Sequence, residues 1–341
     1  MGDAALNADI EALLIAGGIS PLDVQIEPCA PSGNNRVYRL DVSGRVLAAK
    51  RYFRHPSDNR DRLNTEYAFL TYAREAQIVC VPHPIAKDDR SGLALYEFID
   101  GDRLSQETLK SRHIEHARDF FVRLNDPAKR VFATALPPAS EARFSIVGQL
   151  DLVQERLARL SQIPPTSLFA GEAIAFMTAL RARWGVLRER VLTESTKGGI
   201  DPNEELPLRD RCISPSDFGF HNALVKQDGR TVFLDFEYAG WDDPAKAVGD
   251  FFSHPAVPVP FDYFKSFLDA ALAFSPRARL LAQRTRLLLP VFQAKWCCIV
   301  MNDFLPSHWE RSKFADPALD EASTKRIQLE KAYRLLELIH G

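Results

Sequence analysis

The sequence has too few cysteines, and too small an excess of charge, for several common classes of protein. Its five cysteines are odd in number and include no Cys-x-x-Cys pair. This argues against a disulfide framework or a zinc site and indicates reduced thiols in a cytoplasmic protein. The formal net charge is only −2, so the composition gives no sign of the basic surface that nucleic-acid binding requires. We therefore expect no nucleic-acid partner.

Long apolar runs are also missing. The N-terminal stretch up to Gly18 is acidic where a signal peptide would be basic, and its apolar run is short, so we expect no export signal. No apolar run approaches the ~18 residues that a membrane-spanning helix needs, so we expect no membrane partner. With 46% hydrophobic residues in a chain of 341, a large core can form, and the length favours two lobes or domains.

The first hundred residues have the pattern of a small sheet with helices. A short helix is expected over residues 5–17, and residues 59–76 have apolar side chains at helical spacing. Ser43-Gly44 marks the turn of a β-hairpin. Strand-like runs cover residues 24–28, 36–42, 45–53, 85–87 and 93–99. Together these runs predict a five-stranded antiparallel sheet.

Beyond Gly101 the pattern is mostly helical. Helices are expected over residues 113–124, 144–160, 168–194, 261–273, 279–304 and 325–340, with the fifth interrupted by Pro290. One β-rich stretch, residues 212–236, lies among them. The pattern predicts an α+β chain, with an N-terminal part over residues 1–100 that contains the sheet and a larger, mostly helical part over residues 101–341.

Three polar side chains in the β-rich stretch have a spacing suited to chemistry. Asp217 precedes Asn222 by five residues, and Asp235 follows a strand-like run. Residues 223–225 and 231–234 have the pattern of a hairpin, which would return the chain so that Asp235 lies beside Asn222. Carboxylate and amide oxygens are ligands that magnesium prefers. The alternative is an ordinary turn, in which Asp217 and Asn222 cap backbone groups and Asp235 simply ends a strand.

These residues resemble the catalytic and metal-binding loops of the aminoglycoside phosphotransferase and choline kinase family, which are protein-kinase-like enzymes acting on small molecules. The runs SDFGFHNALV and VFLDFEYAGWDDP are the basis of the resemblance. It implies a bilobal protein-kinase-like fold, with a small antiparallel-sheet N-terminal lobe and a larger helical C-terminal lobe. It also implies ATP and magnesium as cofactors and a small-molecule hydroxyl group as the acceptor.

The resemblance further implies a role for each of the three residues. Asp217 would orient and deprotonate the acceptor hydroxyl, while Asn222 and Asp235 would hold magnesium. One departure is Pro215, which stands where the family usually has a histidine that braces the metal-binding segment.

The run RVLAAKRYF contains the small residue and the lysine that the resemblance associates with nucleotide binding. Alternation along a strand places Ala48 and Lys50 on one face, so that Ala48 would cover adenine and Lys50 would reach the α- and β-phosphates. Glu66 borders the apolar face of the helix that follows, where an unpaired carboxylate is costly, so we expect it to pair with Lys50. The alternatives are a solvated Lys50 and a Glu66 that reaches solvent beside Arg62.

Two further stretches resemble parts of a nucleotide site. The phosphates would be covered by the turn between the first two strands, through Ser32, Gly33 and Asn34. An ordinary hairpin loop explains that turn equally well. Adenine would be bound by backbone groups of a hinge between the lobes, at Glu97, Phe98 and Ile99. A simple edge strand is the alternative there.

We expect the acceptor pocket between the Asp217 loop and the C-terminal helices. Aromatic rings suit the apolar faces of sugars, and a carboxylate can pair with an amine. The residues expected there are Trp296, Asn302, Asp303 and Trp309. The alternative for the two tryptophans is packing in the core or on the surface. The eight histidines are scattered along the sequence, and we expect them in core or surface positions rather than in a metal site.

The sequence thus predicts an ATP- and magnesium-dependent phosphotransferase acting on a sugar, an amino sugar, an aminoglycoside or a choline-like alcohol. The rival interpretation is a nucleotide-binding pseudokinase without turnover, which Pro215 and the single glycine of the phosphate loop favour and the intact acidic residues oppose. A protein kinase is disfavoured because no Ala-Pro-Glu segment follows Asp235. Nothing in the sequence selects the acceptor or the oligomeric state.

Overall fold

An antiparallel sheet forms the base of the N-terminal lobe in the computed structural model, which describes residues 3–29, 35–54 and 60–339. The strand order is β1-β2-β3-β5-β4, which confirms the predicted five-stranded sheet. Ser43 and Gly44 both have positive φ, the geometry of a tight hairpin turn between β2 and β3. The strands are β1 (Val24–Pro28), β2 (Arg36–Val42), β3 (Arg45–Arg51), β4 (Pro84–Asp88) and β5 (Leu93–Glu97).

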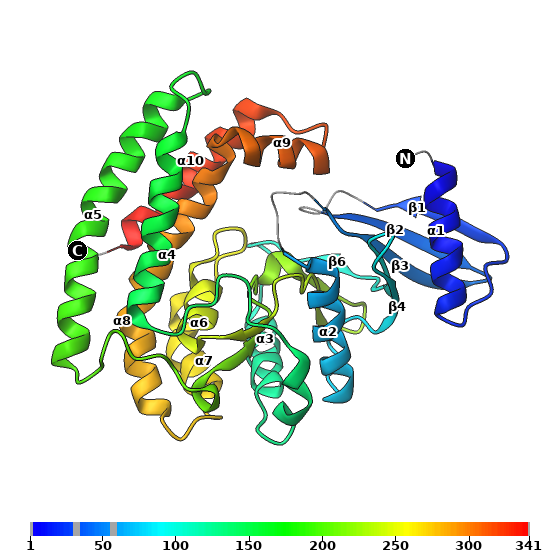
Figure 1. Cartoon of the computed structure of the whole chain (residues 1–341), viewed down its shortest axis with the longest axis horizontal. Coiled ribbons are helices and arrows are strands. Elements are labelled where there is room, and N and C mark those ends of the chain that lie inside the picture. Colours follow the sequence, from blue (N-terminus) through cyan, green and yellow to red (C-terminus); the bar gives the residue numbers. More distant parts are fainter. Residues whose placement is uncertain (1–2, 30–34, 55–59, 340–341) are drawn as a thin grey trace.

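Two helices accompany the sheet (Figure 1). The first, α1 (Asp3–Ala16), packs buried side chains such as Leu13 against apolar residues of the strands. The second, α2 (Arg62–Glu75), begins at Asp61, whose carboxylate accepts a hydrogen bond from the Asn64 backbone N–H. Its apolar face is buried in a core that it shares with the helical lobe. Helix α2 therefore joins the two lobes, and it has Glu66 in its middle.

The rest of the chain is mostly helical, which confirms the predicted bilobal fold. The helices are α3 (Ser111–Leu124), α4 (Ile146–Arg159), α5 (Ala170–Lys197), α6 (Pro244–Ser253), α7 (Phe264–Ala271), α8 (Ala278–Val300), α9 (Pro306–Ala315) and α10 (Glu321–Leu338). Short 3-10 turns lie at Arg130–Ala135, Leu160–Gln162, Leu208–Asp210, Phe220–Asn222, Phe261–Tyr263 and Met301–Phe304. Six of the helices match predicted ones, and α6 and α9 do not.

Two differences from the prediction have a physical reason. Helix α8 continues through Pro290 without interruption, because its packing against α4, α5 and α6 outweighs the loss of one backbone hydrogen bond. The sequence does not predict α6 because it has only ten residues, and its two charged residues, Lys246 and Asp250, are buried in ion pairs instead of forming a solvent-exposed face. Its start is nevertheless regular, since Asp243 caps it and Pro244 occupies its first turn.

Residues 278–304 are also more membrane-like than the sequence analysis allowed. By length and composition alone this stretch could cross a membrane. However, 72% of its most apolar window is buried inside the fold, against neighbouring helices. We therefore interpret α8 as the central core helix of the C-terminal lobe (Figure 1).

Two small sheets shape the β-rich stretch. One joins β6 (Asp102–Arg103), β8 (Ala223–Val225) and β9 (Thr231–Phe233), and the other pairs β7 (Cys212–Ser214) with β10 (Gly240–Asp242). The predicted hairpin is β8-β9. The ring of Phe236 stacks on Phe69 of α2 at a centroid distance of 4.5 Å, and Phe233 stacks on Phe120 of α3 at 4.8 Å. The segment around Asp235 is thus anchored between helices of the two lobes.

Candidate active site

Lys50 lies between two carboxylates at the junction of the lobes. Its Nζ is 2.6 Å from Glu66 Oε2 and 2.6 Å from Asp235 Oδ1. The predicted Lys50–Glu66 pairing is confirmed. The alternative, in which Glu66 reaches solvent, is wrong, because Glu66 is only 4% exposed. Arg62 instead lies 3.4 Å from Glu237. Tyr52 donates its hydroxyl hydrogen to Glu66 Oε2 at 2.7 Å, which completes the cluster.

Charge in this cluster is unevenly balanced. Burial alone lowers the pKa of Lys50, but the carboxylates of Asp235 and Glu66 outweigh it and raise that pKa well above the ordinary lysine value. Burial raises the pKa of Asp235, and the neighbouring Glu66 adds to the effect although Lys50 opposes it. Lys50 therefore stays protonated while two carboxylates share it, so a second cation beside Asp235 would be favourable.

The backbone around the hairpin holds Asp235 in place. The Leu234 N–H donates to the Asn222 carbonyl at 2.8 Å, which brings Asp235 beside Asn222, as predicted. Asp235 has a left-handed backbone with φ of 65°, a conformation that aspartate tolerates better than most residues. The Phe236 N–H donates to Glu66 Oε1 at 3.3 Å. The main chain on both sides of Asp235 is thus hydrogen-bonded.

Asn222 and Asp235 together form an oxygen donor set that fits magnesium. The Asn222 side-chain nitrogen donates to the Asp217 carbonyl at 3.1 Å, which leaves the amide oxygen as its acceptor group for a cation. Asp235 uses one carboxylate oxygen, Oδ1, for Lys50. Hard oxygen ligands and excess negative charge are what a small divalent cation requires.

Asp217 has a different environment, made by two histidines. Its Oδ1 is 3.5 Å from His221 Nε2 and 3.7 Å from His254 Nε2. Burial raises the pKa of Asp217, but His221 and then His254 more than offset this and hold the pKa below the ordinary aspartate value. Its side chain remains 31% exposed, so the ionised carboxylate can meet a bound molecule.

The sequence analysis missed both histidines. His221 directly precedes Asn222, so its place in the loop was available as a signal. His254 follows α6, and only the fold brings it to Asp217, so no local pattern could have found it.

A cavity of about 340 Å³ opens between the lobes beside these residues. Its walls include Lys50 and Glu66, together with Asn222 and Asp235 from the helical lobe. The predicted adenine-site residues line the same cavity, namely Ala48, Glu97, Phe98 and Ile99. The predicted phosphate-loop residues Ser32, Gly33 and Asn34 fall outside the described residues.

The residues predicted for the acceptor pocket fall into two groups. Trp296 lies with its ring edge-on to His254 at 4.3 Å and donates its Nε1 hydrogen to Asp250 at 3.0 Å, so it is close to the Asp217 cluster. The other three lie where α8 is followed by α9. Asn302 accepts a hydrogen bond from Arg159, Lys325 faces the Trp309 ring at 6.0 Å, and Asp303 contacts His308 at 2.9 Å and Gln328 at 2.6 Å.

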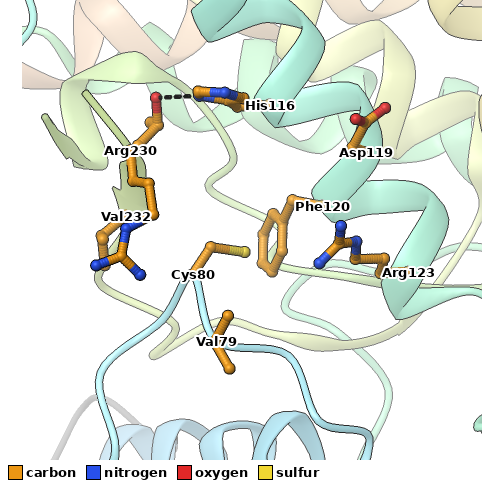
Figure 2. A pocket seen from close by; sticks show the side chains of 9 residues that line it. Val79, Cys80, His116, Asp119, Phe120, Arg123, Arg230 and Val232 are labelled. Atoms are coloured by element: carbon orange, nitrogen blue, oxygen red, sulfur yellow. Dashed lines mark hydrogen bonds between the residues drawn. The ribbon is translucent and has the colours of Figure 1, made fainter. Parts of the chain in front are cut away.

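A second, smaller cavity of about 180 Å³ borders the same hairpin (Figure 2). Figure 2 shows Val79 and Cys80, from the segment between α2 and β4, facing Phe120 and Arg123 of α3. The Cys80 carbonyl accepts a hydrogen bond from the Phe233 N–H at 2.9 Å. The segment after α2 is thus tied to the strand that leads to Asp235.

Comparison with known proteins identifies relatives at the level of family and fold. A sequence model described as the phosphotransferase enzyme family matches residues 25–280. No curated protein sequence matches the chain.

Solved structures that share the fold include the following three. An ethanolamine kinase of Plasmodium vivax has 11% identity and a TM-score of 0.60, over 99% of this chain and 91% of that one. A choline/ethanolamine kinase family protein of Mesorhizobium loti has 18% identity and a TM-score of 0.58, over 99% and 95%. A spectinomycin phosphotransferase, APH(9)-Ia, in complex with ADP and spectinomycin has 12% identity and a TM-score of 0.58, over 98% of both chains.

Proposed function

The chain belongs to the phosphotransferase enzyme family, and from this premise we propose that it transfers the terminal phosphate of ATP, with magnesium, to a hydroxyl group of a small molecule. The observation that carries the proposal is that Asp217 and Asp235, which one loop and hairpin connect, have different charged neighbours. Asp235 is paired with a lysine, whereas Asp217 faces imidazoles. A lysine shared by two carboxylates suits phosphate and metal binding, because the ammonium group attracts phosphate and the excess negative charge attracts a metal ion. An ionised carboxylate apart from this cluster suits proton acceptance.

Nucleotide binding is assigned to the cavity between the lobes. Lys50 is charged and buried, so its ammonium group can attract the α- and β-phosphates, while Glu66 and Tyr52 fix the position of the side-chain network. The adenine ring would lie against Ala48 and the backbone at residues 97–99, which line the same cavity. Asn222 and Asp235 would hold magnesium, whose charge would offset that of the phosphates.

Asp217 is assigned to the acceptor. Its carboxylate, ionised at neutral pH, would accept a hydrogen bond from the substrate hydroxyl, orient it and take its proton as the phosphate is transferred. The acceptor classes that we propose are sugars, amino sugars, aminoglycosides and choline-like alcohols. Trp296 is the stronger candidate for a pocket wall, because Asp303 already has several hydrogen-bond partners.

The proposal is tested by comparing two isosteric variants with an acceptor found by screening these classes for ATP consumption. Asp217→Asn removes the proton acceptor, so turnover should fall roughly 10²–10⁴-fold while magnesium-ATP affinity stays nearly unchanged. Asp235→Asn removes a metal ligand charge, so both magnesium-dependent ATP binding and turnover should fall. Near-normal turnover of Asp217→Asn would contradict the mechanism. ATP binding without turnover on any acceptor would instead support the pseudokinase interpretation.

A further inference from the structure

Two imidazole rings from distant parts of the chain converge on one oxygen of Asp217. His221 lies in the turn Phe220–Asn222, and His254 follows α6. Their Nε2 atoms are 3.5 and 3.7 Å from the same atom, Asp217 Oδ1. The rings are stacked 3.8 Å apart at an interplanar angle of 9°, and Trp296 supports His254 edge-on. Side chains on three elements thus fix this arrangement.

The backbone contact of His254 shows which of its ring nitrogens carries the hydrogen. The Ala256 backbone N–H donates to His254 Nδ1 at 3.2 Å, so Nδ1 has a lone pair and the ring hydrogen of neutral His254 is on Nε2. Burial, followed by the proximity of His221, lowers the pKa of His254 well below the ordinary histidine value, so the ring is neutral. The Nε2–H of His254 therefore points to the Asp217 carboxylate as a donor.

His221 has the same orientation toward Asp217. Its Nδ1 is buried and has no hydrogen-bond partner within residues 3–29, 35–54 and 60–339. Its polar contact in that part of the chain is therefore the one that Nε2 makes with Asp217. Pro215, two residues before Asp217, offers no side-chain donor, so the imidazoles supply the groups that orient the carboxylate.

A metal site is the obvious alternative for an aspartate and two histidines whose ligand atoms lie within 4.8 Å of one another. A metal ion on His254 Nε2 would require the ring hydrogen on Nδ1, where the Ala256 N–H already points. Two hydrogens would then face each other. The cluster is consequently arranged for hydrogen bonds to Asp217 rather than for metal binding.

We propose that His254, with His221 stacked on it, is a positioning residue that holds Asp217 Oδ1 so that Oδ2 faces the acceptor hydroxyl. The inference rests on the proposed function, in which Asp217 is the catalytic carboxylate. Both contacts are longer than a closed hydrogen bond, as catalytic contacts often are before the reacting groups bind, and they shorten when the acceptor is in place. Without them the carboxylate rotates, and the reactive oxygen loses its alignment.

The test compares variants of His254 that keep or remove the donor. His254→Phe keeps a ring against His221 and Trp296 but lacks the N–H, and His254→Gln keeps an N–H donor. We expect kcat to fall roughly ten- to a hundredfold in His254→Phe, since small misplacements of reacting groups have effects of this order. The KM for magnesium-ATP should stay within about twofold, because the nucleotide contacts are unchanged. His254→Gln should recover most of the lost kcat.

Two comparisons separate positioning from stability. His113 is also buried, and its Nδ1 accepts a backbone N–H, that of Lys110, at 3.1 Å. His113→Phe and His113→Gln should therefore lower the melting temperature as the His254 variants do, without changing kcat. If His254→Phe does not fold, His254→Met replaces it, because methionine matches glutamine in length and differs in lacking the donor.

The outcomes distinguish this inference from the proposed function. Loss of kcat in the Phe or Met variant with recovery in His254→Gln supports the positioning role. Unchanged kcat in the donor-free variant, or equal losses with and without the donor, would overturn it while Asp217→Asn remains inactive. If Asp217→Asn itself keeps its turnover, the proposed function fails first. Inhibition by zinc ions that disappears in His254→Gln would favour the metal site instead.

Discussion

At the scale of single residues, the buried Lys50 is stabilised by oppositely charged side chains in direct contact with it. Lys50 is 8% exposed and serves both Glu66 and Asp235, so its ammonium group offsets two costly desolvations at once. Such a cluster contributes little net stability while it is intact. Removing one partner is strongly destabilising, because it leaves a buried charge without compensation. The role of Lys50 in the fold can therefore be separated from its proposed role with phosphate.

The first prediction concerns the loss of that ammonium group. Lys50→Met should lower the free energy of unfolding by about 3–5 kcal/mol, because Glu66 and Asp235 are left buried without a cation. It should also abolish measurable magnesium-ATP binding. Denaturant unfolding and calorimetric titration check the two effects. Lys87→Met is the control, since Lys87 forms a partly exposed pair with Asp89 at 2.9 Å and its loss should change stability by less than about 1 kcal/mol. A stability loss of that small size in Lys50→Met would contradict the argument.

A second residue-scale prediction concerns acid stability. Burial raises the pKa of Glu141, but the ion pair with Arg156 outweighs it and lowers the pKa from 4.5 to about 2. A lowered carboxyl pKa stabilises the fold above the unfolded-state pKa, and this contribution is lost as pH falls from about 4.5 toward 2. Glu141→Gln should therefore cost about 1 kcal/mol at pH 7, a modest value because the side chain is 35% exposed.

The measurement is denaturant unfolding of wild type and Glu141→Gln between pH 7 and pH 3. The difference between them should be constant down to about pH 5 and should shrink below it. Glu155, whose side chain is 64% exposed in its pair with Arg143, provides the control, and Glu155→Gln should differ little from wild type at any pH. A Glu141→Gln difference that grows on acidification would show that the sign is wrong.

At the scale of elements, the packing of α6 against α8 positions the residues around Asp217. Both α6 and the central part of α8 are buried, and Lys295 of α8 bonds to Asp250 of α6 at 2.5 Å. His254 leaves the C-terminal end of α6, and Trp296 of α8 lies against it. The separation of the two helices therefore controls where His254 meets Asp217.

The third prediction tests this packing through Gly249. A Cβ added there would lie 2.2 Å from Cδ2 of Phe292 on α8, so Gly249→Ala forces the helices apart. We expect a loss of about 1–3 kcal/mol in the free energy of unfolding, with a fall in kcat because His254 moves. Gly185→Ala is the matched control, since nothing lies within 4 Å of its added Cβ. In the interior of α5, alanine should stabilise by roughly 0.5–1 kcal/mol. Equal stability of the two variants would contradict the prediction.

The elements also show how far the sequence alone reaches. Each strand of the sheet could be predicted because alternation and turn residues such as Ser43-Gly44 are local signals. The Asp217, Asn222 and Asp235 spacing was equally readable, since one hairpin connects them. Helix α6 was not predictable, because it is short and its charged residues are buried in ion pairs. The pairing of His254 with Asp217 depends on how α6 packs. Sequence reasoning therefore found Asp217, Asn222 and Asp235 within one supersecondary unit but overlooked His221 in the same loop. It could not have found His254, which another unit supplies.

At the scale of the whole molecule, the cavity between the lobes is lined on one side by the N-terminal sheet and on the other by the helical lobe. Lys50 and the residues around Glu97 come from the sheet, and Asn222 and Asp235 come from the helical lobe. Strand β5 ends at Glu97, and β6 already pairs with β8 in the helical lobe. The boundary near residue 100 remains a prediction, but any ligand that fills the cavity must contact both parts.

The fourth prediction follows from that arrangement. Magnesium-ATP should stabilise the protein by roughly 2.7 kcal/mol when present at ~100 times its dissociation constant, because it binds the folded state alone. Since its contacts come from both lobes, the melting transition should shift as a whole rather than split into two steps. Scanning calorimetry with and without magnesium-ATP measures the shift.

Asp235→Asn gives the matching control for this prediction. The variant keeps the cavity and Lys50 but weakens the metal site, so ATP with magnesium should stabilise it hardly more than ATP alone. Two separate transitions in the wild type, with only one responding to the nucleotide, would show that the ligand binds one lobe by itself. A complete absence of any shift with ATP or GTP and magnesium would contradict nucleotide binding, and with it both the kinase and the pseudokinase interpretations.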